Sequence, residues 1–583
     1  MGADVGGIIA IILFYLLILI IGIWAAWKNK FKPGHGKILR NEVIMIGRRD
    51  IGLILGIFTM TATWVGGAYI NGTAEGIYVI GRGLIWTQAP IGFAISLIIG
   101  GLFFAKQMRV RRYVTMLDPF QETYGDRIGS LMFFPAVMGE LFWTGSVLSA
   151  LGSSLSVIFD INFQLAVTIS TAISVSYTLL GGLYSVAYTD MAQLFFIFIG
   201  LFVSLPFAAT HPAVTNIGIT ASQYVYREPW LGTIGPGTVW IWVDNWFLMI
   251  FGGLPWQVYF QRVLSASTAF HAQIMSFVAG FTTLILAIPS VIIGAVGAST
   301  DWNKTTYGLP DPSDRDEAHM ILPIILRYLC PKHIAFFGLG AISAAVMSSA
   351  DSSILSSSSM FTRNIYHCIF RHKATDNELV WVMRGAIVLF GIAAAAMTWL
   401  STSVYGLWYL SSDLVFVLLF PQLVSVLYIK GTNVYGCVTG YIFGLFLRVG
   451  GGEPYLRLQP FICYAGCYLD IKFPTGPIYI QTFPFKTVSM LTSFLVSLCV
   501  SRLTNYLFKK GMFPQKLDFL NGFVSQPKNE KTNRVASLAN ESTDVIEQMP
   551  SDKEATDPLG TTSQNNEPVG DEVSSPAISK TDD

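Results

Sequence analysis

Long apolar runs separated by short polar breaks follow one another along the first 510 residues of the chain. The first run, residues 7–27, contains no charged residue, and its length matches the roughly 20 apolar residues that a helix needs to cross a bilayer. No basic stretch precedes it, so the run is predicted to be a retained helix and not a cleaved signal peptide. The pattern predicts an all-α protein with thirteen transmembrane helices, near residues 7–27, 51–75, 83–105, 129–158, 163–181, 189–209, 237–258, 272–298, 333–359, 379–400, 404–428, 434–449 and 485–507.

Composition agrees with a polytopic membrane protein. Of the 583 residues, 52% are hydrophobic, 14% aromatic and only 13% charged, whereas soluble domains carry about 25% charged residues. Residues 511–583 hold 6 basic and 13 acidic side chains, net −7, which leaves 31 and 23, net +8, before them. We predict a transmembrane domain over residues 1–510 and a disordered cytoplasmic tail over residues 511–583, either a solvated leash or a site for trafficking proteins. Nothing here supports nucleic-acid binding.

The basic residues predict the orientation, because positive side chains concentrate in cytoplasmic loops. A basic stretch follows the first run, so its N-terminus is expected outside, and an odd number of spans then puts the C-terminus inside. The basic residues that this topology places on the cytoplasmic side include Arg40, Arg48, Arg49, Arg109, Arg111, Arg112, Arg127, Arg262, Arg363, Arg371, Lys373, Lys430, Lys509 and Lys510.

Two covalent features follow from this topology. The sequon Asn303-Lys304-Thr305 falls in a predicted exofacial loop, so we predict glycosylation of Asn303. A second sequon begins at Asn540 but lies in the predicted cytoplasmic tail. The six cysteines show no zinc spacing and no disulfide framework; only Cys463 and Cys467 are placed to form a bridge, and the sequence leaves open whether they do.

Two of the predicted spans are interrupted by small residues next to tryptophan. Residues 59–67 read TMTATWVGG, and residues 251–256 read FGGLPW. Breaks of this kind free backbone carbonyls and amides, which in a membrane must line a polar cavity or bind an ion. Matched breaks five helices apart indicate inverted repeats with a binding site near the midplane. The alternative is that the glycines only allow close helix packing.

Charged side chains inside spans are costly, so each is expected to have a partner or a task. The candidates are Glu140, Asp190, Asp244, Asp351 and Asp413. Residues 348–353 read SSADSS, which places several hydroxyls and Asp351 on one helix, and oxygen-only ligands suit an alkali cation and no transition metal. The alternative is that the serines bond back to their own helix carbonyls.

Three tryptophans, Trp64, Trp143 and Trp256, fall near the middle of predicted spans. Converging indole faces can bind a quaternary ammonium by cation–π attraction, although ordinary aromatic packing is an alternative. Trp27, Trp230 and Trp408 are interpreted as anchors at the membrane interface.

Longer motifs resemble a known family. GGLYSVAYTD at residues 181–190, followed by Gln193, and residues 338–366 around SSADSS resemble the two signature stretches of the sodium/solute symporter family. TMTATWVGG, QAPIG at residues 88–92 and TDW at residues 300–302 are similar to the members of that family that carry choline. The resemblance covers residues 7 to about 520, so it leaves out the tail.

The resemblance implies a leucine-transporter-type fold, in which two inverted five-helix repeats each begin with a broken helix, the first and the sixth of the core. Sodium would be held by the carbonyls of Thr59 and Ala62 and the hydroxyls of Ser348 and Ser349. A second sodium would bind at Asp190 with Ser352 nearby, and whether Asp351 touches sodium is left open.

Choline would lie between the three mid-span tryptophans, with Asp244 nearby. Phe93 stands where the resemblance leads us to expect tyrosine, so it keeps the ring face and loses a hydroxyl.

The function implied is sodium- and chloride-dependent choline uptake by alternating access, at the plasma membrane of presynaptic terminals with recycling through endosomes and synaptic vesicles, for acetylcholine synthesis in cholinergic neurons. No sequence feature locates the chloride, and the oligomeric state is not predicted. The alternatives are a sodium symporter for another small solute, or a ligand-gated sensor or channel on the same scaffold. An enzyme is not expected.

Overall fold

The computed structural model describes residues 5–30, 40–180, 182–470, 478–514, 517–520 and 522. Residues 1–522 group into one compact unit, and residues 523–583 form a second unit that lies outside the described residues. The predicted disorder of the tail therefore falls almost wholly on residues that are not described.

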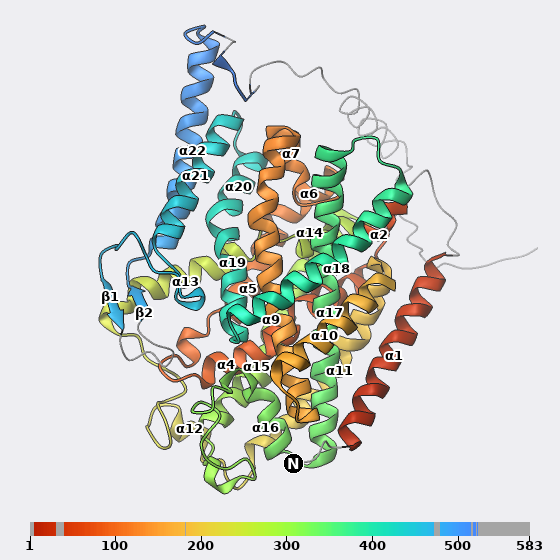
Figure 1. The fold of residues 1–583 in the computed structure, drawn as a ribbon, viewed down its shortest axis with the longest axis vertical. Helices are drawn as coiled ribbons and strands as arrows, with labels where there is room; N and C mark the ends of the chain where they lie inside the picture. Colours follow the sequence, from red (N-terminus) through yellow and green to blue (C-terminus); the bar gives the residue numbers. More distant parts are fainter. Residues whose placement is uncertain are drawn as a thin grey trace, which may run out of the picture. The chain divides into compact units, whose positions relative to one another are not determined.

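The described part of the compact unit is mainly helical (Figure 1). Its first half contains α1 (Val5–Lys30), α2 (Arg40–Ile46), α3 (Leu53–Trp64), α4 (Gly67–Tyr78), α5 (Ala89–Ile99), α6 (Lys106–Val110), α7 (Asp118–Tyr124), α8 (Asp126–Gly129), α9 (Phe133–Phe159), α10 (Phe163–Leu180), α11 (Leu183–Ala209), α12 (Ile217–Thr220), α13 (Val239–Gly252) and α14 (Gln257–Ser265). Its second half contains α15 (Ala269–Ala298), α16 (Ile321–Leu329), α17 (Lys332–Met360), α18 (Asp376–Leu400), α19 (Val404–Leu414), α20 (Phe420–Tyr428), α21 (Val434–Gly450) and α22 (Phe485–Lys509).

Several helices begin where a polar side chain can cap them. Thr375, Ser403 and Asn433 precede α18, α19 and α21, and their side chains accept hydrogen bonds from the backbone amides of Glu378, Gly406 and Gly436. Such caps satisfy amides that the first helical turn leaves without a partner.

Eight helical segments in the described residues are long and apolar enough to span a bilayer, and the bent pair α3 and α4 makes a ninth. Of the other predicted spans, those near residues 7–27, 163–181 and 434–449 correspond to shorter apolar helices, and the one near residues 237–258 is divided between α13 and α14. A membrane protein with at least eight candidate spans is thus confirmed, whereas the total of thirteen stays a prediction.

Helix α9 lies at the centre of the bundle, where it packs against α4, α10, α17, α18 and α19 (Figure 1). Helix α1 packs on α11 and α17, and α21 pairs with α22 at the other side. This arrangement brings segments from both halves of the sequence onto the same central helix.

Both predicted breaks are present. Helices α3 and α4 are bent by 42° at Val65 and Gly66. The helical ladder extends to the bond from the Val65 amide to the Thr61 carbonyl and resumes with the bond from Ile70 to Gly66. Residues 253–256 similarly separate α13 from α14. Two core helices are therefore interrupted, as their Gly-rich sequences predicted.

The connection between α21 and α22 contains two β-strands, contrary to the all-α prediction. Strands β1 (Cys467–Asp470) and β2 (Ile478–Gln481) pair antiparallel, with Cys467 opposite Gln481. A disulfide joins Cys463 to Cys467 at the entry to this hairpin, which answers the question that the sequence left open.

Candidate functional site

Five aromatic side chains from five helical segments meet in the core, and we call them the ring cluster: Trp64, Phe93, Trp143, Trp256 and Trp408. Each has at most 2% of its surface exposed. The two breaks supply two of the rings, because Trp64 is the last residue of α3 and Trp256 directly precedes α14. The broken helices therefore place these indoles in the middle of the bundle.

Phe93, on α5, is the common neighbour within the ring cluster. Its ring centroid lies 5.2 Å from Trp408, 5.3 Å from Trp256, 6.2 Å from Trp143 and 6.4 Å from Trp64. Most of these contacts are edge-to-face or tilted, which aromatic quadrupoles favour. A cation is attracted within about 6 Å of a ring centroid. Because these rings already pack directly against one another, they must move apart before an ammonium group can fit between them.

The sequence-based interpretation of Trp408 as an interfacial anchor is wrong. Trp408 lies in the first turns of α19, is fully buried, and packs on Tyr69, Phe93, Trp143 and Tyr405. Its place near the start of an apolar run suggested the interface, but the helices around it cover it completely. Its place in the ring cluster depends on contacts with residues that are far away in the sequence, and no local sequence pattern predicts them.

Three indole N–H groups of the cluster lack a hydrogen-bond partner among the described residues: those of Trp64, Trp256 and Trp408. A buried donor without a partner costs free energy, about 1–3 kcal/mol each. A ligand that carries an oxygen would satisfy one of them. The cluster therefore offers both π faces and a polar donor.

A second centre lies around the buried carboxylate of Asp190 on α11, and we call it the Asp190 centre. The hydroxyls of Thr59 on α3 and Ser348 on α17 both donate to Asp190. Arg262, on α14, pairs with the same carboxylate, with 3.5 Å between Nη2 and Oδ2. Three residues predicted to bind sodium thus come together, and the two broken helices contribute to one site.

Arg262 is buried, although the sequence pattern suggested only a basic residue at the cytoplasmic end of a span. Its side chain is 1% exposed. Its guanidinium also donates to the Ser352 hydroxyl at 2.5 Å. Burying a charge is tolerated here because a carboxylate and a hydroxyl compensate it.

The other predicted sodium ligands lie on the same helices. The Ser349 hydroxyl donates to the Thr63 carbonyl at 3.2 Å, so α17 contacts α3 directly at its broken end. Ala62 is fully buried in that last turn, and the described hydrogen bonds include none from the Gly66 amide to its carbonyl. These oxygen atoms form a hard donor set of the kind that suits an alkali cation.

Asp351 is directed to a different helix. One carboxylate oxygen accepts from the Thr178 hydroxyl of α10 at 2.9 Å, and the other has no hydrogen-bond partner among the described residues. The structure therefore does not link Asp351 to the Thr59 and Ser348 hydroxyls by a direct hydrogen bond.

Asp244, which was predicted to lie near the ligand, makes its hydrogen bonds to α22. Its carboxylate accepts from the backbone amides of Lys486 and Thr487 at 3.2 and 2.7 Å and from the Thr487 hydroxyl at 2.5 Å. These groups form the first turn of α22, whose amides lack partners within the helix. The charge of Asp244 fastens α13 to α22, which explains its burial without a ligand.

The remaining charged candidates also have protein partners. Glu140 on α9 accepts from the hydroxyls of Ser353 and Ser356. Asp413 on α19 pairs with Arg448 on α21, which in turn pairs with Glu453. These contacts join helices of the scaffold.

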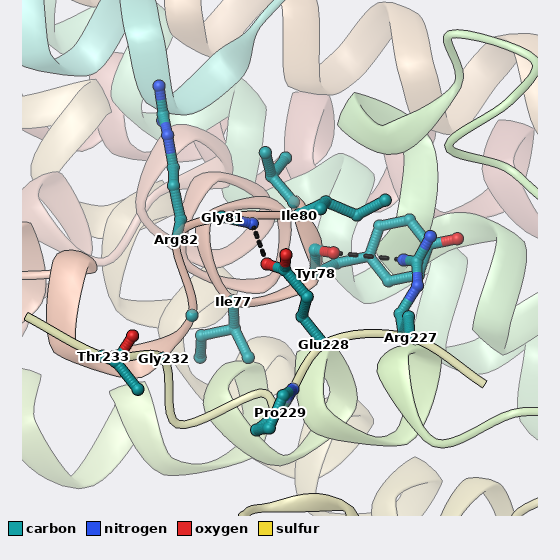
Figure 2. A pocket seen from close by; sticks show the side chains of 12 residues that line it. Ile77, Tyr78, Ile80, Gly81, Arg82, Arg227, Glu228, Pro229, Gly232 and Thr233 are labelled. Carbon is teal, nitrogen blue, oxygen red and sulfur yellow. Dashed lines mark hydrogen bonds between the residues drawn. The ribbon is translucent and has the colours of Figure 1, made fainter. Parts of the chain in front are cut away.

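A separate cavity of about 150 Å³ lies beyond the end of α4 (Figure 2). Arg227 lies 4.0 Å from the Tyr78 ring and 3.1 Å from the Asp311 carboxylate, while Glu228 accepts from the Gly81 amide at 2.8 Å. Its lining contains no member of the ring cluster, and its third charged residue, Arg82, lies over the rings of Tyr405 and Tyr455.

Membrane-length helices, two of them interrupted beside buried ring and carboxylate centres, define the class of the molecule as a polytopic membrane transport protein. A family model described as the sodium:solute symporter family matches residues 44–444. The chain belongs to the sodium:solute symporter family, and it is a transporter and not an enzyme.

Similar proteins cover nearly the whole chain. High-affinity choline transporter 1 of Torpedo marmorata is 62% identical over 530 residues, which are 91% of each chain. High affinity choline transporter 1 of Homo sapiens is 57% identical over 583 residues and 100% of both chains. Among solved structures, a Na+-coupled sialic acid symporter has a TM-score of 0.64 at 14% identity, covering 85% of this chain and 97% of its own, which supports the fold alone.

Proposed function

We propose that the chain takes up choline across the plasma membrane together with sodium. The observation that carries this proposal is the joint position of the two centres on the broken helices. Thr59 of the Asp190 centre and Trp64 of the ring cluster are on α3, while Trp256 directly precedes α14, which carries Arg262. An ion bound at one centre therefore acts on the same segments that hold the substrate.

Choline would be held by the five rings of the ring cluster, to which we add Trp408 and Phe93 beside the three mid-span tryptophans. Each π face contributes roughly 0.5–2 kcal/mol to binding a cation, and a free indole N–H is available for the choline hydroxyl. A sugar or amino acid would need several fixed polar side chains, whereas the five residues of the ring cluster are all aromatic. We keep Asp244 as a nearby negative charge of the proposed substrate site, although its oxygens accept hydrogen bonds from α22.

Sodium would be held at the broken end of α3 by the carbonyls of Thr59 and Ala62 and the hydroxyls of Ser348 and Ser349. A second ion would bind at Asp190, near Ser352. The donor set supports this assignment because it consists of hard oxygen ligands from α3, α11 and α17. Asp351, whose carboxylate accepts from the Thr178 hydroxyl, remains a further candidate ligand for sodium.

The transport cycle would follow alternating access. Sodium binding ties α3 to α17 and favours the outward-open form, choline completes the site, and the broken helices then rock against the scaffold. The same proposal includes the details of the architecture. The protein would have thirteen spans, two inverted five-helix repeats and its N-terminus outside, and the membrane domain would give way to the cytoplasmic tail near residue 510. Each positive charge moved inward gains about 2.3 kcal/mol per 100 mV, so voltage drives choline as well as sodium.

The physiological setting is proposed from the sequence resemblance. Uptake would also require chloride and would supply acetylcholine synthesis in presynaptic terminals, where the protein would recycle through endosomes and synaptic vesicles. Tail-binding trafficking proteins would direct that recycling.

The decisive experiment is uptake of radiolabelled choline into liposomes that contain the purified protein, with sodium, chloride and choline varied one at a time. We expect accumulation against the choline gradient that disappears when N-methylglucamine replaces sodium. Choline-gated current without accumulation would instead support the sensor or channel, and accumulation of another solute would support a different symporter.

The Phe93 ring gives a test of the substrate site. Phe93→Leu removes the π face while keeping an apolar side chain, so we expect the choline concentration for half-maximal uptake to rise about fivefold, since one face contributes about 1 kcal/mol. Phe93→Tyr keeps the face and should stay within about threefold of the original. Uptake kinetics with surface biotinylation measure both variants, and equal behaviour of the leucine and tyrosine variants would remove Phe93 from the site.

Asn303 gives a test of the topology. It is exposed in the middle of a short 3₁₀ turn, Trp302–Lys304, in a loop that we propose to be exofacial. Asn303→Gln is expected to lower the apparent mass on a gel by one N-glycan, about as much as glycosidase treatment does, because only lumenal sequons are modified. Asn540→Gln, in the proposed cytoplasmic tail, is the matched control and should leave the mass unchanged.

A further inference from the structure

A second cavity, of about 410 Å³, lies where three polar segments of the chain meet, and we call it the basic pocket. It is lined by Glu42, Gly47, Arg48, Arg49, Arg109 and Arg112. Small-ligand pockets have volumes of about 300–1,000 Å³, so this cavity is large enough for more than a single ion. None of its residues belongs to the ring cluster or the Asp190 centre.

The charge in the basic pocket is strongly unbalanced. Four arginines face one glutamate, a net of three positive charges. Glu42 is already engaged, since it pairs with Arg49 at 3.0 Å. Burial lowers the pKa of Arg49, and the adjacent Arg112 charge lowers it further.

Two of the guanidinium groups are fixed by the backbone. Arg49 donates to the carbonyls of Tyr113 and Arg112 at 2.9 Å each, and Arg109 donates to the carbonyls of Ala266 and Ser267 at 2.7 and 3.2 Å. Arg112 is exposed, and its guanidinium makes no hydrogen bond or ion pair among the described residues. The basic pocket thus combines preorganised donors with a side chain that is free to close over a ligand.

Two arginines that line the basic pocket adopt a strained backbone conformation. Gly47, Arg49 and Arg112 have φ values of 65°, 57° and 54°, so two non-glycine residues of the lining adopt the left-handed region. Strained residues of this kind persist where the surrounding structure requires them, and they gather at functional sites. Positive residues alone would mark a cytoplasmic surface, but they would not require the guanidinium groups of Arg49 and Arg109 to be held by backbone carbonyls of separate segments.

We propose that the basic pocket binds a small anion that carries two or more phosphate groups, such as a phosphoinositide headgroup or a soluble inositol phosphate. Planar guanidinium groups bind phosphate oxygens in pairs, which gives them geometric fit as well as charge. A multiply charged anion matches the net charge of the pocket, whereas a single chloride would leave most of it unbalanced. The proposed topology puts the pocket at the cytoplasmic face, where phosphorylated lipids are available.

The pocket lies at the junction of the two broken helices. The Ile51 amide, before α3, donates to the Ser265 carbonyl at the end of α14, and the Ser267 amide donates to the Ile51 carbonyl. Arg109 bonds the same connection, at Ala266. A bound anion would neutralise the repulsion among the arginines and stabilise this junction.

The test compares Arg112→Gln with Arg111→Gln in the purified full-length protein. Arg111 is the adjacent residue, is also exposed and carries the same charge, but it does not line the pocket. Binding of radiolabelled inositol trisphosphate is measured in phosphatidylcholine nanodiscs, and binding of phosphatidylinositol bisphosphate is measured by native mass spectrometry. Neither readout depends on choline, so failure of this proposal is separate from failure of the proposed transport function.

We expect Arg112→Gln to weaken binding about tenfold and Arg111→Gln to weaken it less than twofold, since the loss of one charge-assisted contact is large compared with the loss of a diffuse charge. Ligand binding should raise the unfolding temperature of the original protein, and this increase should be smaller in the Arg112→Gln variant. Binding of both probes would identify the phosphate groups as the recognised chemistry, and binding of the lipid alone would identify the headgroup in its membrane as the source. Absence of binding, or equal effects of the two variants, would overturn the proposal.

Discussion

Replacing Trp256 by alanine is expected to raise the choline concentration for half-maximal uptake at least tenfold. Trp256 contacts three other rings of the cluster, at 5.4 Å from Trp64, 5.3 Å from Phe93 and 5.0 Å from Trp143. Its loss removes one π face, worth up to about 2 kcal/mol, and also releases the neighbouring rings from their positions. Uptake kinetics and choline binding to the purified protein measure the effect.

Two further variants separate binding from folding, since a Trp→Ala change in a core costs about 3–5 kcal/mol of stability. Trp256→Phe keeps a π face and should fold well, with an intermediate rise in the choline requirement. Trp240→Ala, at a position on α13 that is 64% exposed, is the control and should leave transport unchanged. If Trp256→Ala reached the surface and took up choline with its original concentration dependence, the ring cluster would not be the substrate site.

Replacing Asp190 by asparagine is expected to abolish the sodium stimulation of choline uptake. The amide keeps the shape but removes the charge that Thr59, Ser348 and Arg262 surround. It also leaves Arg262 buried without an anionic partner, which destabilises proteins by about 3–5 kcal/mol. Sodium-dependent uptake and thermal unfolding are therefore both measured.

The double variant Asp190→Asn with Arg262→Gln distinguishes the two effects. Because the double variant removes both charges of the Asp190–Arg262 ion pair, we expect stability to return towards that of the original protein while sodium dependence stays lost. Ser349→Ala is a milder variant that should raise the sodium requirement more than the choline requirement. Recovery of sodium-dependent uptake in the double variant would show that Asp190 acts only as the structural partner of Arg262.

Much of the fold could be predicted because membrane helices are determined by local composition. The apolar runs located most of the long helices, and the sequences at residues 59–67 and 251–256 located both breaks, since glycine and proline interrupt a helix wherever it lies. The hairpin of β1 and β2 and the helix α16 were not predicted, because both are much shorter than the apolar runs of membrane length from which the helices were located.

The site was only partly predictable. Trp64, Trp143 and Trp256 were recognised because tryptophan is unusual in the middle of an apolar run. Trp408 was missed because its burial depends on rings from other helices, and the partner of Asp244 lies 243 residues away in the sequence. Which groups pair across a bundle is decided by packing, and one sequence does not contain that information.

In the transport cycle that we propose, Arg262 would matter most in the half in which neither choline nor sodium is bound. If a transported ion were the only counter-charge of the buried Asp190 carboxylate, the carboxylate would be unpaired after each ion release, which costs several kcal/mol. The Arg262 guanidinium lies 3.5 Å from the Asp190 carboxylate. Because it is part of the protein, it stays there when a bound ion leaves. In the proposed cycle, the Asp190 carboxylate would therefore keep a counter-charge while the unloaded protein returns to its outward-open form.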